Sequence, residues 1–124
     1  MKLFIVEDSP MMKVRLIQML EQIEVVEIIG EADNQNDAIT KISELKPDVV
    51  VLDIRLKEGN GLEVLKYIKT ELPSTVVIML TNYPYVQYRD KSFSMGADYF
   101  FYKATEFTKV FDVVSSIVQN SKNN

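Results

Sequence analysis

The sequence contains no cysteine, no histidine and no tryptophan. Without cysteine, the chain can form no disulfide, no thiolate metal site and no cysteine nucleophile. Without histidine, acid–base catalysis by an imidazole and metal sites with histidine ligands are also excluded. Glycine and proline each occur only four times, and no linker, repeat or low-complexity segment interrupts the chain.

Long apolar runs and an excess of basic residues are also missing. The start of the chain, MKLFIVEDSP, has too short an apolar run before Glu7 and Asp8 to be a signal peptide, and no stretch approaches membrane-spanning length. We therefore expect a cytoplasmic protein without a membrane partner. The formal net charge is −4 with no basic stripe, so this domain is not expected to bind nucleic acid directly.

The 124 residues are enough for one globular domain with a single sizeable core, and 47% of them are hydrophobic. We expect this domain to span residues 1–120 and to be followed by a polar tail, 121–124. The polar tail is compatible with a complete single-domain protein and with the excised front part of a longer one.

Short apolar runs alternate with helical patterns along the chain. In the first helical pattern the predicted inner stripe is Val14, Ile17 and Leu20, and Thr105 is the predicted cap of the last helix. Five strands alternating with five helices predict an α/β fold with a doubly wound parallel sheet, and the flavodoxin-like strand order 2-1-3-4-5 fits five strands. The predicted strands are 3–6, 25–30, 49–52, 75–80 and 98–102.

Polar side chains follow four of these strands. Glu7 and Asp8 follow the first strand, and Asp53 follows the third, which is its neighbour in the expected order. Thr81 and Lys103 end the fourth and fifth strands. Each of these residue types ends many strands without any function, but here all of them reach the edge of the sheet where ligand crevices form. The sequence therefore predicts a site at this edge.

The residue types suggest a phosphoryl group and a hard cation. Two carboxylates 4 Å apart repel each other by roughly 4 kcal/mol at an effective dielectric constant of 20. A folded protein would therefore keep three of them together only if a cation binds there or if their negative charge has a function. Mg²⁺ prefers carboxylate oxygens and phosphate oxygens. Lys103 and Thr81 can bind phosphoryl oxygens, and the carboxylate of Asp53 can act as a nucleophile that forms an acyl phosphate.

Several segments of the chain, taken together, resemble the receiver domain of two-component response regulators, over essentially the whole length of the chain. The matching segments are FIVEDSP (4–10), PDVVVLDIRL (47–56), NGLEVL (60–65), VVIMLT (76–81) and GADYFFYK (96–103).

The resemblance implies that Asp53 accepts a phosphoryl group from the phosphohistidine of a sensor histidine kinase. It also implies a magnesium site made by Asp8, Asp53 and the backbone carbonyl of Arg55, with Glu7 acting directly or through a water molecule. Lys103 would bind the phosphate. Such a protein catalyses only its own phosphorylation and dephosphorylation.

The resemblance further implies a switch in which Thr81 moves toward the phosphate and an aromatic residue, Phe100, follows. The readout surface would be formed by the fourth helix, the fifth strand and the fifth helix. Its partner would be a downstream protein or an output domain absent from this chain, and a homodimer is a further alternative. Three tyrosines make this surface unusually aromatic, or else pack on the neighbouring helix: Tyr83, Tyr85 and Tyr88.

Three positions depart from the family pattern, which often has proline at Lys57, a small residue at Asn82 and proline at Ala104. These departures keep open an alternative, a pseudo-receiver that acts as an interaction module without phosphate. A flavodoxin-like nucleotide or flavin binder is a third alternative, but no glycine-rich loop follows the first strand to hold a phosphate.

Two bulky residues are expected beside the phosphorylated aspartate. Arg55 and Tyr83 each lie two residues beyond a site residue, on either side of the path by which water would attack the phosphate. We therefore predict slow self-dephosphorylation.

Overall fold

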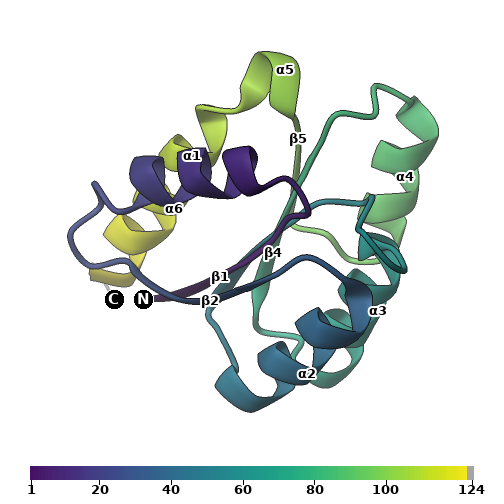
Figure 1. Cartoon of the computed structure of the whole chain (residues 1–124). Coiled ribbons are helices and arrows are strands. Elements are labelled where there is room, and N and C mark those ends of the chain that lie inside the picture. The colour runs from purple at the N-terminus through teal and green to yellow at the C-terminus, as the bar shows by residue number, and fades with distance from the viewer. Residues whose placement is uncertain (123–124) are drawn as a thin grey trace.

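The computed structural model describes residues 1–122, which form one sheet of five parallel strands in the order β2-β1-β3-β4-β5 (Figure 1). The predicted fold class and strand order are confirmed. No helix in the described residues is long and apolar enough to cross a membrane. The strands are β1 (Lys2–Val6), β2 (Glu27–Ala32), β3 (Val49–Leu52), β4 (Val76–Thr81) and β5 (Tyr99–Tyr102). The helices are α1 (Pro10–Leu20), α2 (Gln35–Leu45), α3 (Gly61–Glu71), α4 (Val86–Ser94), α5 (Lys103–Glu106) and α6 (Lys109–Lys122).

Polar caps begin the first three helices. The Ser9 hydroxyl accepts a hydrogen bond from the backbone amide of Met12, and Pro10 occupies the first position of α1. Asn34 caps α2 and Asn60 caps α3 in the same way. These side chains satisfy amides that have no partner within the helix. Because each cap lies in the connection after a strand, it fixes where the chain turns away from the carboxyl edge of the sheet.

Helices cover both faces of the sheet, with α1 and α6 on one face and α2, α3 and α4 on the other (Figure 1). Side chains of β1 alternate between the two layers: Leu3 and Ile5 pack with α1 and α6, while Phe4 and Val6 pack with α2 and α3. Strands buried on both faces explain the continuous apolar runs of the sequence.

The first helix buries a different stripe from the predicted one. Val14 is 52% exposed, whereas Leu16 and Leu20 are buried and Ile17 is partly buried. The inward placement predicted for Val14 is therefore wrong. Most positions of PMMKVRLIQML are apolar, so two neighbouring stripes fit the helical period equally well.

The end of the chain forms two helices where one was predicted, so the helices number six rather than five in the described residues. Thr105 lies inside α5 and does not cap a helix. The Glu106 carboxylate accepts hydrogen bonds from the Tyr102 amide at 3.1 Å and from the Lys109 ammonium at 2.9 Å. Glu106 thus ties the start of α5 to the start of α6 and holds the junction between them. The last helix continues to Lys122, into the expected tail, and residues 123–124 lie outside the described part.

The second strand lies two residues later than predicted. Gly30, expected at its end, lies inside β2. A Cβ atom at Gly30 would come within 2.8 Å of a ring carbon of Phe4 on β1. Glycine here allows the close approach of a neighbouring ring and does not mark a turn.

Helix α4 is the most weakly buried of the crossover helices. Among its nine residues only Ser92 is buried, and the Ser92 hydroxyl donates a hydrogen bond to the Tyr88 carbonyl at 2.7 Å. Val86 is 60% exposed and Phe93 41% exposed. With so few buried contacts, α4 is the helix that can shift on the sheet at the lowest free-energy cost.

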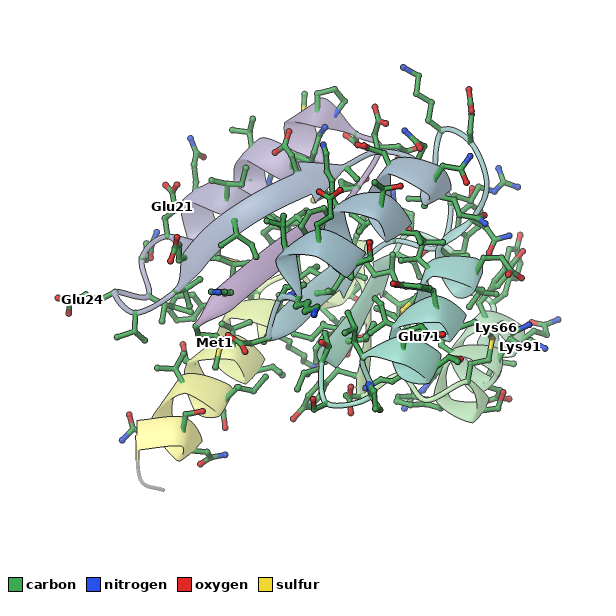
Figure 2. The ribbon with its side chains drawn as sticks, turned by 90° about the horizontal axis from the view of Figure 1, so that it is seen from below. Met1, Glu21, Glu24, Lys66, Glu71 and Lys91 are labelled. Atoms are coloured by element: carbon green, nitrogen blue, oxygen red, sulfur yellow. The ribbon has the colours of Figure 1, made fainter. Side chains whose placement is uncertain are left out.

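Several exposed charged side chains mark the two ends of the molecule in Figure 2, where Glu71 of α3 lies on the same side as Lys66 and Lys91. Glu21 and Glu24 follow α1 at one end, and Lys66 of α3 and Lys91 of α4 lie at the opposite end (Figure 2).

Candidate functional site

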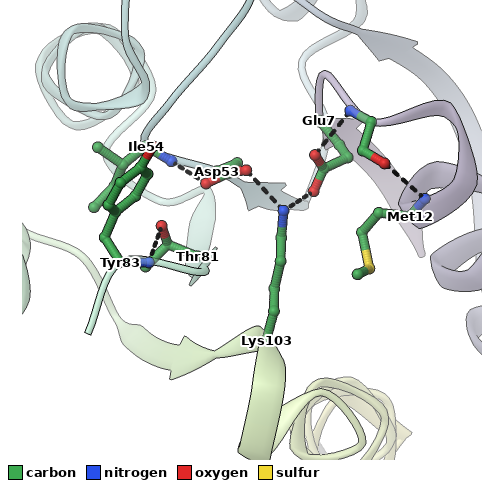
Figure 3. A network of polar contacts seen from close by, with 8 residues as sticks. Glu7, Met12, Asp53, Ile54, Thr81, Tyr83 and Lys103 are labelled. Carbon is green, nitrogen blue, oxygen red and sulfur yellow. Dashed lines mark hydrogen bonds and ion pairs between the residues drawn. The ribbon is translucent and has the colours of Figure 1, made fainter.

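The carboxyl ends of the strands meet at a pocket of about 450 Å³. Glu7 reaches it from β1, Asp53 from β3 and Lys103 from β5 (Figure 3). Asp8, the residue after Glu7, also lines this pocket. The Asp53 amide donates a hydrogen bond to the Val6 carbonyl at 3.0 Å, which holds the loops after β1 and β3 side by side. The structure thus brings the acidic pair, the aspartate and the lysine together.

Lys103 lies between two carboxylates (Figure 3). Its ammonium is 2.7 Å from Oδ2 of Asp53 and 2.5 Å from Oε1 of Glu7. All three side chains are buried, with exposed fractions of 4%, 7% and 2% respectively. One cation therefore offsets the repulsion between two buried anions, and removing it would leave both charges unpaired.

Burial and charge shift the protonation of this cluster. Burial raises the pKa of the Glu7 carboxyl, although hydrogen bonds from Lys103 and from the Ser9 amide oppose the shift. Burial also disfavours the Lys103 ammonium, but the charges and hydrogen bonds of Asp53 and Glu7 outweigh it and raise the pKa of Lys103. Lys103 is therefore protonated at neutral pH and available to a phosphoryl group.

Backbone groups of Ile54 and of Gly61, the first residue of α3, hold Asp53 in place. Oδ1 of Asp53 accepts a hydrogen bond from the Ile54 amide at 2.7 Å. The Gly61 amide donates to the Ile54 carbonyl at 2.6 Å, and a Cβ atom on Gly61 would lie 1.9 Å from the carbonyl oxygen of Asp53. Only glycine fits there, so Gly61 is a positioning residue for Asp53. The sequence marks it only as part of a turn.

The acidic residues fit a hard cation. One carboxylate oxygen from each of Glu7, Asp8 and Asp53 lies within 4.8 Å of the others. Asp8 is exposed, whereas Glu7 is buried and its Oε2 accepts a hydrogen bond from the Ser9 amide at 3.0 Å. Oxygen ligands of this kind suit Mg²⁺, which keeps several waters and takes one or two carboxylates. The donor set therefore suits a hard cation such as Mg²⁺.

Thr81 and Phe100 lie beside the pocket rather than on its lining. Thr81 is fully buried at the end of β4, and its hydroxyl accepts a hydrogen bond from the Tyr83 amide at 3.3 Å (Figure 3). Phe100 on β5 is 7% exposed. Its ring centroid is 6.4 Å from that of Phe93 on α4 and 5.4 Å from that of Tyr102. Phe100 thus connects the sheet to α4.

Arg55 and Tyr83 close one side of the pocket. Cζ of Arg55 lies 4.7 Å from the ring centroid of Tyr83, in a cation–π contact between the loops after β3 and β4. The Tyr83 ring is in turn 5.8 Å from the ring of Tyr88, which lies 6.1 Å from that of Tyr85. Tyr88 packs against the core, while Tyr85 is 56% exposed. The packing interpretation therefore holds for Tyr88, while the role of the exposed Tyr85 in an interaction surface stays a prediction.

The departures from the family pattern leave the site assembled. Lys57 replaces a frequent proline, yet its backbone amide donates to the Asp33 carbonyl at 3.0 Å and fastens the loop. Ala104 follows Lys103, whose ammonium still reaches Asp53. Asn82 is exposed and lines the pocket.

Comparison with known proteins agrees with this geometry. The family model of the response regulator receiver domain matches residues 3–115. The response regulator protein VraR of Staphylococcus epidermidis is 32% identical over 113 residues, which are 91% of this chain and 54% of that protein. The chain therefore spans about half the length of the curated relatives that it matches.

Solved structures show the same fold. A DNA-binding response regulator of the LuxR family from Staphylococcus aureus superposes with a TM-score of 0.85 at 28% identity, covering 94% of this chain and 97% of that one. The response regulator domain of Thermotoga maritima CheB has a TM-score of 0.83 at 26% identity, covering 100% and 97%. This chain belongs to the family of response regulator receiver domains of two-component systems.

Proposed function

We propose that this chain is a phosphorylation-dependent switch in which Asp53 accepts a phosphoryl group from a histidine kinase. One observation carries the proposal: the Lys103 ammonium lies 2.7 Å from Oδ2 of Asp53, in a pocket shared with Glu7 and Asp8. The pocket thereby combines a nucleophilic oxygen, a fixed cation for phosphoryl oxygens and carboxylates for a metal. The receiver domain occupies residues 1–120 and works in the cytoplasm, where it meets the kinase.

The chemistry is a transfer between two side chains. A carboxylate oxygen of Asp53 attacks the phosphorus of a phosphohistidine. The new O–P bond forms as the P–N bond breaks, and the electron pair of that bond returns to the imidazole nitrogen of the kinase. Lys103 exchanges its contact with the Asp53 carboxylate for one with a phosphoryl oxygen. Later attack of water on the phosphorus releases inorganic phosphate and restores Asp53.

Asp8, Asp53 and the backbone carbonyl of Arg55 would hold Mg²⁺. Glu7, already bound by Lys103 and the Ser9 amide, suits contact through a water molecule. When bound, Mg²⁺ supplies positive charge that offsets the repulsion between these carboxylates and an incoming phosphoryl group.

The switch runs through Thr81 and Phe100. The hydrogen bond from the Tyr83 amide to the Thr81 hydroxyl is long, at 3.3 Å, so turning this hydroxyl toward a phosphoryl oxygen gives up little. Such a turn pulls the loop that leads to α4. Phe100 contacts Phe93 of α4. An inward movement of Phe100 therefore changes how the weakly buried α4 packs against the sheet.

The readout surface is formed by α4, β5 and the helices that follow β5. Tyr85 and Tyr99 are 56% and 37% exposed on this side, and aromatic side chains are enriched at interfaces. Its partner is a downstream protein, an output domain or a second copy of this chain. An output domain would fit the greater length of the curated relatives, about half of which this chain spans.

The test is phosphorylation with acetyl phosphate and Mg²⁺, read on a phosphate-affinity gel. We expect a shifted band that disappears in Asp53→Asn and after chelation of the metal. If no band appears, the assay is repeated with a phosphorylated histidine kinase, because not every receiver accepts small donors. Failure of both donors, with no effect of Mg²⁺ on the folded protein, would support the phosphate-independent pseudo-receiver.

A further inference from the structure

A second concave site lies between α3 and α4, apart from the phosphorylation pocket. This groove has a volume of about 480 Å³, within the range of ligand-binding clefts. It shares no lining residue with the pocket around Asp53. Its walls consist mainly of Leu62, Lys66, Lys69 and Thr70 from α3, and of Lys91 and Met95 from α4 and its end.

The groove is basic in a protein that is acidic overall. Three lysines line it against one carboxylate, Glu63, while the whole chain carries a net charge of −4. Lys69 is already engaged, because its ammonium lies 2.8 Å from Oδ2 of Asp98 and 2.7 Å from the Thr75 carbonyl. The excess positive charge of the groove therefore comes from the two other lysines, Lys66 and Lys91, partly offset by Glu63.

Lys66 and Lys91 line the same groove from different helices, and Figure 2 shows both at one end of the molecule. Both are exposed, and within residues 1–122 no carboxylate lies within ion-pair distance of either ammonium. Glu63 lines the groove and Glu71 lies on the same side of the molecule (Figure 2), but neither carboxylate forms an ion pair with Lys66 or Lys91. The two ammonium groups are thus available to an anionic ligand from outside.

The groove also has an apolar part. Leu62 and Met95 line it and are only partly buried by the rest of the chain. The flexible thioether of Met95 can adapt to apolar groups of different shape. On α3, Leu62, Lys66 and Lys69 are spaced at i, i+4 and i+7, so one helix face presents apolar and basic groups in a row.

We propose that the groove between α3 and α4 binds an acidic, amphipathic segment of a partner protein. An apolar side chain of the partner packs between Leu62 and Met95, and its carboxylates lie against Lys66 and Lys91. A protein segment fits better than a free anion, because exposed ion pairs are weak alone and no buried cation points into the groove. Apolar burial along the groove supplies the remaining affinity. This inference does not depend on phosphorylation of Asp53.

The test is a titration of the isotope-labelled protein with a synthetic helical peptide that carries leucine and glutamate on one face, followed by backbone amide NMR. We expect shift changes centred on Lys66, Lys91 and Met95. The variant Lys66→Glu/Lys91→Glu weakens binding at least tenfold. The control Lys2→Glu/Lys46→Glu, which changes two exposed lysines elsewhere to the same extent, retains binding.

Three further arms make the outcome decisive. A peptide with lysine in place of glutamate should not bind. Inorganic phosphate and a nucleoside diphosphate should cause smaller shifts than the acidic peptide at equal concentration. Absence of binding, shifts outside the groove, an equal loss in the control variant, or stronger binding of phosphate or nucleotide would each overturn the proposal.

Discussion

The guanidinium group of Arg55 lies over the ring of Tyr83, with Cζ 4.7 Å from the ring centroid. This contact joins the loop after β3 to the loop after β4 along one side of the pocket that contains Asp53. The two side chains stabilise each other's position there through the cation–π attraction. A water molecule approaching a phosphoryl group on Asp53 from this side meets both of them.

Removing either side chain should therefore speed the loss of phosphate. In Arg55→Ala and in Tyr83→Ala we expect severalfold faster decay of the phosphorylated protein, because water gains access to the phosphorus. The decay is measured after removal of the donor, at constant Mg²⁺. Tyr85→Ala is the matched control, since Tyr85 contacts Tyr88 and does not line the pocket. Unchanged decay in both variants would show that the contact does not limit access of water.

Lys103 should stabilise the fold as well as bind phosphate. Lys103→Met leaves the carboxylates of Glu7 and Asp53 buried without a counter-charge, which we expect to lower the free energy of unfolding by roughly 3 kcal/mol. Urea unfolding at neutral pH measures the loss. Adding Asp53→Asn and Glu7→Gln should recover part of it, because the unpaired charges are removed. A loss no larger than that of Lys2→Met, at an exposed site, would contradict this role.

Gly61 should be intolerant of even a methyl group. In Gly61→Ala the new Cβ atom overlaps the Asp53 carbonyl oxygen, so the start of α3 and Asp53 must move apart, at a cost of about 1–3 kcal/mol. We expect a lower melting temperature and slower phosphorylation by acetyl phosphate in the fraction that stays folded. Glu63→Ala, at an exposed position in the first turn of the same helix, should change neither. Normal phosphorylation of a stable Gly61→Ala protein would show that Asp53 needs no such support.

Glu106 should make the stability of the C-terminal junction depend on pH. Hydrogen bonds from Lys109 and from the Tyr102 amide hold the pKa of Glu106 below its ordinary value of 4.5 in the folded chain. Because the folded pKa is the lower one, ionised Glu106 stabilises the fold above the unfolded pKa, and this contribution disappears as the pH falls through the folded pKa.

Glu106→Gln should accordingly lower the melting temperature at neutral pH and have a smaller effect near pH 3, below the unfolded pKa. Thermal unfolding of both proteins across this range measures the difference, with the exposed Glu21→Gln as control. An effect that is the same at both pH values would mean that the charge of Glu106 is not involved.

The sequence predicts the strand order and the meeting of the acidic residues with Lys103 because both follow from general rules. Apolar runs such as Val49–Leu52 end abruptly at a polar residue, and parallel strands present all their carboxyl ends on one edge. The identity of the residues at that edge was therefore sufficient to place Asp53 beside Glu7.

Other features depend on tertiary contacts that periodicity does not contain. Nothing in the apolar first helix distinguishes Val14 from Leu16, and only packing on the sheet decides between them. The break after Glu106 rests on a side chain that bridges two helices. The contact between Arg55 and Tyr83 joins two loops that are far apart in the sequence. The close approach of Gly61 to the Asp53 carbonyl depends on the path of the loop between them, which hydrophobic periodicity does not describe.

The most direct test of the account is an intact-mass measurement of the chain after incubation with a phosphoryl donor and Mg²⁺. We predict a single phosphoryl adduct that hydroxylamine removes, as expected for an acyl phosphate, and that is absent from Asp53→Asn. An adduct that persists in Asp53→Asn, or no adduct with either acetyl phosphate or a phosphorylated histidine kinase, would contradict the central claim that Asp53 is the phosphoryl acceptor.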